Sequence, residues 1–224
     1  MLLLGVDTSG KHGSLALARG DVGKFEVLEV APLAGGTFSA QLIPQIAALL
    51  SRHSLSKEHV EAIAAASGPG SFTGLRVGLA AVKALAEILK KPIAAVSLLE
   101  AVAVESGQEG KVVAALDAGR GEVYAGELEV AGGQASLCHE CLFNFDEFAD
   151  VLRTSGRHAV TPDEGVAQAL KERGVAEAVS MVSRPRGATI ARLGLRKILA
   201  GQTVDPEQLD ANYIRRSDAE IFRK

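Results

Sequence analysis

The first side chains that could do chemistry are Asp7, Thr8 and Ser9, which follow the apolar run Leu2 to Val6 and precede Gly10. Backbone N–H groups and hydroxyls in such a turn can accept an anion, while the aspartate holds a cation or a water molecule. The same residues also suit an ordinary Asx-type turn in a β-hairpin. The sequence therefore leaves two interpretations open, a phosphate-binding turn and a purely structural one.

The remaining candidates for metal or nucleophilic chemistry form no recognisable set. Cys138-His139-Glu140-Cys141 is a CxxC pattern without a second pair. Positions i and i+3 of a strand point to opposite faces, so we do not expect these two thiols to converge on zinc or to act as a dithiol. No two of the five histidines stand four residues apart; they are His12, His53, His59, His139 and His158. These residues therefore predict no metal site, and no catalytic residue or cofactor is predicted from them.

A glycine-rich loop, Ser67-Gly-Pro-Gly-Ser-Phe-Thr-Gly74, separates the apolar run Val60 to Ala66 from a helical segment, Gly74 to Leu89. This order predicts strand, tight turn and helix, with Ser71 or Thr73 as the helix cap. The loop lacks the Gly-Lys-Ser/Thr of a Walker motif and the dinucleotide fingerprint. By itself the loop indicates only a helix N-terminus that can lie close to an anion or to the backbone of a neighbouring segment.

The helical segment is apolar on nearly every side, so it must be covered on two sides. Gly74, Gly78 and Ala81 recur at i, i+4 and i+7 and form a stripe of small residues that lets another helix approach closely. One cover is the chain's own sheet. The other is either a neighbouring helix of the same chain or a partner protein.

Composition and charge narrow the class of protein. The chain has 224 residues, 47% of them hydrophobic, and a net charge of −3. Without an excess of basic residues, direct tight binding to RNA is not favoured. Met1 to Gly5 lacks the basic residues with which a signal peptide begins. No uncharged apolar run is long enough for a membrane span. We expect a cytoplasmic protein that makes no contact with membranes.

Two successive halves each open with a strand, an Asp-containing glycine turn and another strand. We expect strands at Leu2 to Val6, Ser14 to Ala18, Phe25 to Val30, Val60 to Ala66, Ile93 to Val96, Val112 to Leu116, Glu122 to Val130, His158 to Thr161 and Val179 to Val182. We expect helices at Ser39 to His53, Gly74 to Leu89, Ser97 to Gly107, Asp146 to Leu152, Asp163 to Arg173 and Ala188 to Leu199, with Ser39 and Ser97 as caps. This α/β order fits a duplicated actin-like ATPase fold.

Ordered motifs along most of the chain resemble the bacterial TsaB family, also called YeaZ, a paralogue of the TsaD or glycoprotease family. The motifs are Leu3 to Ser9, Leu42 to Pro44, Ser67 to Gly78, Pro92 to Ala101, Leu116 to Tyr124 and Tyr213 to Glu220. The resemblance implies the actin-like, ribonuclease H-like fold in two subdomains, residues 1–107 with the dimerisation helices and a smaller, truncated second subdomain at 108–224. Phe38 stands where the family usually has histidine.

The resemblance also implies a function. Catalytic TsaD relatives carry His-x-x-x-His after a short strand, and Leu98 and Val102 occupy those places in this chain. A non-catalytic subunit is implied, which pairs with a TsaD-like protein and a TsaE-like ATPase to form threonylcarbamoyladenosine on tRNA, reaches tRNA only through that complex, and dimerises when alone. The implied interface comprises Leu42, Ile46, Leu49, Phe72, Gly74, Leu75, Gly78, Leu79, Ala81, Val82 and Leu85.

Two enzymatic alternatives stay open at this point. One is a small actin-fold ATPase or kinase that uses Asp7, Ser9 and Asp117 on Mg-ATP. The other is a metallopeptidase of the glycoprotease type, against which the missing histidine pair counts.

Overall fold

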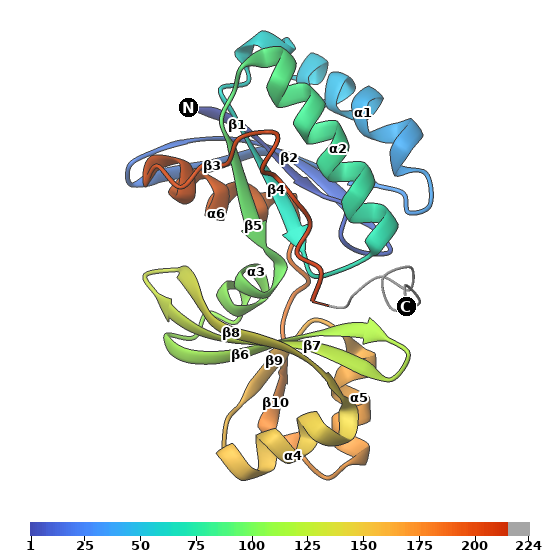
Figure 1. Ribbon diagram of the computed structural model, residues 1–224. Coiled ribbons are helices and arrows are strands. Elements are labelled where there is room, and N and C mark those ends of the chain that lie inside the picture. The colour runs from blue at the N-terminus through green and yellow to red at the C-terminus, as the bar shows by residue number, and fades with distance from the viewer. Residues whose placement is uncertain (215–224) are drawn as a thin grey trace. The chain divides into compact units, whose positions relative to one another are not determined.

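The chain divides into two compact α/β units that are built on the same plan (Figure 1). The computed structural model describes residues 1–214, so Arg215 to Glu220 of the expected C-terminal motif lie outside the described residues. The first unit comprises Met1–Leu98 and Pro185–Ala211, and the second comprises Leu99–Arg184 with the described residues from Asn212. Among residues 1–214, no helix is both long and apolar enough to span a bilayer.

The first unit is a five-stranded mixed sheet in the order β3-β2-β1-β4-β5. Strands β1, β2 and β3 form an antiparallel meander, and β4 and β5 add to the β1 edge in parallel. Its elements are β1 (Leu2–Asp7), β2 (Gly13–Asp21), β3 (Lys24–Leu33), α1 (Phe38–Arg52), a 3₁₀ turn (Lys57–His59), β4 (Ala62–Gly68), α2 (Phe72–Leu89), β5 (Ile93–Ser97) and α6 (Gly187–Leu199).

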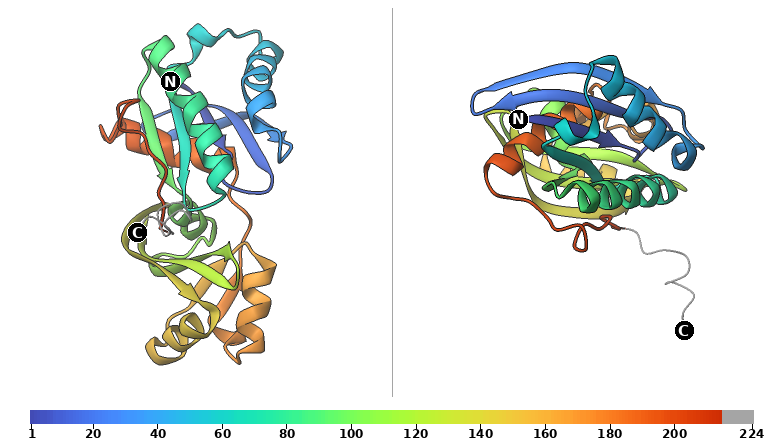
Figure 2. Two further views of the ribbon diagram at one scale, coloured as in Figure 1. Left: turned by 45° about the vertical axis from the view of Figure 1, so that its right-hand side comes forward. Right: turned by 90° about the horizontal axis from the view of Figure 1, so that it is seen from above.

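Helices α1 and α2 cover one face of this sheet, and α6 covers the other (Figures 1 and 2). Strand β1 is buried along its whole length, as expected for a central strand with helices on both faces. Successive side chains of each strand point to opposite faces of the sheet. The larger ones, such as Leu4, Leu17 and Ile63, belong to the core under α1 and α2.

The face under α6 is lined by small residues, which lets the helix approach the sheet closely. A methyl group on Gly194 would overlap Ala64 Cβ and lie 3.6 Å from Ala94 Cβ. One on Gly5 would overlap the Gly187 carbonyl and lie 2.9 Å from Ala191 Cβ. Small side chains on both surfaces therefore bring the two backbones together.

The second unit repeats the topology with the order β8-β7-β6-β9-β10. Its elements are α3 (Leu98–Glu105), of which all but Leu98 belongs here, β6 (Gly110–Gly119), β7 (Glu122–Ala131), β8 (Gln134–Asn144), α4 (Phe145–Ser155), β9 (Ala159–Thr161), α5 (Glu164–Glu172), a 3₁₀ turn (Ala176–Ala178) and β10 (Val179–Met181). All five strands are present, so the expected truncation amounts to the shortness of β9 and β10.

Most expected elements are confirmed within a few residues, and the differences have local causes. Strand β8 was not predicted, because its residues alternate only weakly between exposed and half-buried. Helix α1 begins before Ser39, so that serine is not its cap. Ser71 Oγ does cap α2, accepting from Gly74 N at 3.3 Å, whereas the buried Ser97 Oγ has no hydrogen-bond partner within residues 1–214.

The division into units differs from the expected 1–107 and 108–224. The first unit ends nine residues earlier, at Leu98, and it includes α6 from the far end of the chain. The reason is that the helix after β5 packs in the second unit, while the helix after β10 packs on the sheet of the first.

Candidate functional site

The turn after β1 is buried and its polar groups bond to one another. Asp7, Thr8 and Ser9 are only 5%, 2% and 4% exposed. Asp7 Oδ1 accepts hydrogen bonds from Ser9 N at 2.9 Å and from Ser9 Oγ at 2.6 Å. This is the pattern of an Asx turn, in which the aspartate completes the backbone turn.

The start of α2 packs directly on this turn. Ser71 N donates to Ser9 O at 2.6 Å, and Thr8 Oγ1 donates to Gly74 O at 2.8 Å. A methyl group on Gly74 would overlap the Thr8 carbonyl, and one on Gly78 would overlap the Thr8 hydroxyl and lie 3.1 Å from Thr8 Cβ. The two glycines therefore accommodate a turn of the same chain, and not another helix as the small-residue stripe predicted.

A pocket of about 410 Å³ lies beside the turn, but the three predicted phosphate-binding residues do not line it. Its walls come from the β1–β2 turn, the loops before α1 and α2 and the first turns of these helices, and they include Lys11, His12, Ser39 and Thr73. Phe38 also lines it, is 7% exposed, and packs so close to Gly13 that a methyl group there would lie 2.9 Å from Phe38 Cε1. Phe38 thus contributes packing in this chain, and it carries no nitrogen with which to bind a ligand.

Most residues of the predicted interface point into the core of the first unit. Of the eleven, Phe72 is 38% exposed, and Ala81 and Leu85 are half-buried. The other eight are buried, namely Leu42, Ile46, Leu49, Gly74, Leu75, Gly78, Leu79 and Val82. The side chains of these eight pack within the first unit, so they offer little surface to a partner, and the exposed residues of the two helices offer more.

The outer face of the same two helices is nevertheless apolar. Ile43 on α1 is 50% exposed, and Ile88 on α2 is 71% exposed. The two helices also carry exposed alanines, at positions 40, 47 and 48 of α1 and 80 and 84 of α2. The Arg76 guanidinium lies 3.6 Å from the centre of the Phe72 ring, a cation–π contact at one end of the surface. We call this surface, residues 40, 43, 47, 48, 72, 80, 84 and 88, the outer α1–α2 face.

The segment at the place of the His-x-x-x-His motif is apolar. Leu98 and Val102 begin α3 and its second turn, and they are 3% and 0% exposed. Within residues 1–214, no group of three or more His, Cys, Asp or Glu side chains is arranged to hold a metal ion. Asp117, the other acidic residue of the ATPase alternative, accepts from Gly119 N at 2.8 Å and closes its own turn.

Sequence reasoning missed one pair of side chains. Cys138 and Cys141 are free thiols, and Cys141 Sγ lies 2.9 Å from His139 Nε2. The signal was available, since residues i and i+2 of a strand share a face, but the argument from strand geometry was applied only to the two thiols at i and i+3.

Comparison with known proteins agrees with this architecture. The family described as "TsaD: tRNA N6-adenosine threonylcarbamoyltransferase" matches residues 30–193. The tRNA threonylcarbamoyladenosine biosynthesis protein TsaB of Haemophilus influenzae is 37% identical over 75% of this chain and 67% of its own length. The TsaB protein of Bacillus subtilis is 34% identical over 59% of this chain and 57% of its own length.

The alignments thus span little more than half to two thirds of these curated relatives. A solved structure of YeaZ from Pseudomonas aeruginosa superposes on 94% of this chain and 100% of its own, with a TM-score of 0.73 and 27% identity. The duplicated sheets, the buried Asp7–Ser9 turn and these matches lead to one assignment: the chain belongs to the TsaB (YeaZ) family.

Proposed function

We propose that this chain is a non-catalytic subunit in the formation of threonylcarbamoyladenosine on tRNA, acting in the cytoplasm by binding a TsaD-like catalytic protein. Its relatives in Haemophilus influenzae and Bacillus subtilis are named for that biosynthesis. The observation that carries the non-catalytic part is the pair Leu98 and Val102, whose buried apolar side chains cannot ligate a metal. The chain's own contribution is then to complete and stabilise the catalytic partner.

In this proposal the Asp7–Ser9 turn serves the fold. Asp7 Oδ1 already holds two donors of Ser9, and Thr8 Oγ1 holds the Gly74 carbonyl. The turn therefore fixes the start of α2 against β1. An ATPase would need these groups free for phosphate or for a magnesium ion.

The outer α1–α2 face is the surface that we propose for the partner. Exposed alanines flanked by Ile43, Phe72 and Ile88 offer a shallow apolar surface on which a second pair of helices can lie close. Exposed apolar surfaces of this kind mark interaction sites on soluble proteins. A TsaD-like protein carries a related fold, so it could present an equivalent pair of helices.

We further propose that the chain dimerises through this face when alone, that a TsaE-like ATPase joins the complex, and that tRNA is reached only through the assembly. The net charge of −3 supports the last point, because tight RNA binding by the chain itself would require a basic surface.

Ala84→Arg tests the surface. It places a charge in the middle of the proposed interface, and an unpaired charge buried there typically costs about 2–5 kcal/mol of binding free energy. We expect the affinity for a TsaD-like protein to fall by at least about tenfold, which corresponds to 1.4 kcal/mol. Titration calorimetry measures it, and the melting temperature should stay unchanged because Ala84 is exposed.

Val22→Arg is the matched control, because Val22 is 86% exposed in the turn between β2 and β3 of the same unit. It should leave partner binding unchanged. If both variants bind the partner at wild-type strength, the outer α1–α2 face is not the interface. A loss of self-association without loss of partner binding would separate the two contacts.

A further inference from the structure

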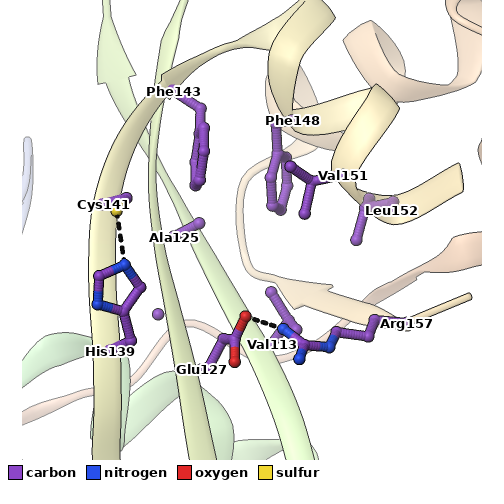
Figure 3. Close-up of a pocket in the computed structure, with 11 residues that line it drawn as sticks. Val113, Ala125, Glu127, His139, Cys141, Phe143, Phe148, Val151, Leu152 and Arg157 are labelled. Atoms are coloured by element: carbon purple, nitrogen blue, oxygen red, sulfur yellow. Dashed lines mark hydrogen bonds and ion pairs between the residues drawn. The ribbon is translucent and has the colours of Figure 1, made fainter. Parts of the chain in front are cut away.

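A cysteine and a histidine form a close pair on the edge strand of the second unit. Cys141 Sγ lies 2.9 Å from His139 Nε2 on β8, and both side chains project from one side of the strand (Figure 3). At this separation the imidazole can take the proton of the thiol. A nucleophile with an adjacent base at hydrogen-bond distance is the arrangement that activates cysteine.

The pair borders a small cavity. The cavity measures about 30 Å³, which is room for roughly one water-sized molecule. Apolar side chains make up most of its wall, among them Phe143 and Phe148, whose ring centres are 5.9 Å apart. The ion pair between Glu127 and Arg157 lines the remainder (Figure 3). A reagent that reaches the sulfur through this cavity must therefore be very small.

We propose that Cys141 is a reactive thiol that hydrogen peroxide oxidises to a sulfenic acid, with His139 as the base. The imidazole takes the thiol proton, and the sulfur attacks one oxygen of the peroxide. The S–O bond forms as the O–O bond breaks, and the departing hydroxide receives the proton from His139 and leaves as water. Sulfur loses two electrons and the peroxide gains them, so the sum is thiol plus peroxide to sulfenic acid plus water.

The second thiol of the CxxC pattern does not share the site. Cys138 is exposed, and its sulfur faces the Ser136 carbonyl at 3.8 Å. Three residues along a strand separate Cα atoms by about 10 Å. Disulfides rarely bridge more than about 7 Å, so Cys138 is not positioned to resolve a sulfenic acid on Cys141. It provides an internal comparison instead, since it is the more exposed of the two cysteines.

The experiment measures both cysteines in one sample of the full-length protein. Dilute hydrogen peroxide is added with dimedone, which traps sulfenic acids, and peptide mass spectrometry follows Cys138 and Cys141 separately. Exposure alone would make Cys138 the faster of the two. We expect Cys141 to be trapped at least about tenfold faster, because only its sulfur has an imidazole beside it.

Two variants test the role of the base. His139→Asn should reduce the rate at Cys141 to that at Cys138. His158→Asn is the matched control, because His158 bonds to Ser180 Oγ at 2.7 Å elsewhere in the same unit, and it should change neither rate. Equal or faster labelling of Cys138 in the wild type, or an unchanged rate at Cys141 in His139→Asn, would overturn the proposal.

Discussion

At the scale of single residues, the contact with Thr8 explains the glycines at positions 74 and 78 of α2. Gly74 and Gly78 share a helix face, which is legible in the sequence from their spacing. The spacing predicts a close approach but not the surface that approaches. The structure identifies that surface as the Thr8 side chain and carbonyl, because the turn after β1 lies under the first two turns of α2.

Gly78→Ala should therefore destabilise the protein, although alanine is the better helix former. The added methyl group would overlap Thr8 Oγ1 and lie 3.1 Å from Thr8 Cβ, and overpacking of this kind typically costs about 1–3 kcal/mol. Gly165→Ala in α5 is the matched control, since nothing lies within 4 Å of the new methyl group there. It should be neutral or stabilising by up to about 1 kcal/mol.

Urea unfolding of both variants measures the difference. In a Thr8→Ala background the cost of Gly78→Ala should shrink, because the overlapping hydroxyl is gone. Equal stability of the two glycine variants would mean that Thr8 does not restrict Gly78.

Capping shows how far residue types alone can lead. Ser71 and Ser97 both stand just before a helix, and the sequence predicts both as caps. Ser71 Oγ reaches Gly74 N, whereas Ser97 Oγ is buried and without a partner. The two helices differ in the backbone that precedes them. A loop precedes α2, whereas the strand β5 runs directly into α3.

At the scale of elements, the strands that are buried on both faces could be predicted and the edge strand β8 could not. Strands β1 and β4 are continuous apolar runs, which distinguish central strands of a layered sheet. Among the strands of residues 1–214, β8 pairs with β7 alone and stands at the edge of its sheet. Its residues are exposed or half-buried and do not alternate strictly between apolar and polar, so the sequence did not indicate the whole strand.

The C-terminal end of α1 makes a partly exposed ionic contact with β3. Glu29 accepts from Arg52 at 2.7 Å and lies 2.9 Å from His53 Nε2. The hydrogen bond from Arg52 is the main cause that lowers the pKa of the Glu29 carboxyl from its ordinary value of 4.5. The contact thereby joins the C-terminal end of α1 to the sheet.

Glu29→Gln should destabilise the protein in a pH-dependent way. Since the folded pKa lies below the unfolded one, the contribution of the ionised carboxylate is present above pH 4.5 and disappears as the pH falls through the lowered value. Thermal melts should thus show wild type more stable than Glu29→Gln at neutral pH and a shrinking gap in acid. Glu26→Gln, at an exposed position of the same strand, controls for the loss of one charge. A gap that stays constant into acid would contradict the assignment.

At the scale of the whole molecule, the sequence indicated the duplication but not which helices belong to which of the two units. Two halves with the same opening pattern predict two sheets of the same order, and that is what the structure has. The boundary was drawn where the pattern restarts. The pattern does not reveal that α6 fills the small-residue face of the first sheet, because Gly5, Ala64 and Ala94 meet Gly187, Ala191 and Gly194 only in the fold.

The discontinuity of the first unit leads to a test with truncated chains. A fragment of residues 1–107 lacks α6, so one face of its sheet would be bare, and the buried Ile190, Leu193 and Leu195 would be missing from the core. We expect this fragment to aggregate or to bind hydrophobic dyes without a cooperative melt. Residues 1–98 joined to 185–211 by a flexible Gly-Ser linker should instead unfold cooperatively, because they form a complete three-layer unit. Circular dichroism melts of the two proteins decide the point. Cooperative unfolding of 1–107 at the same temperature as the fused chain would mean that the first unit does not need α6.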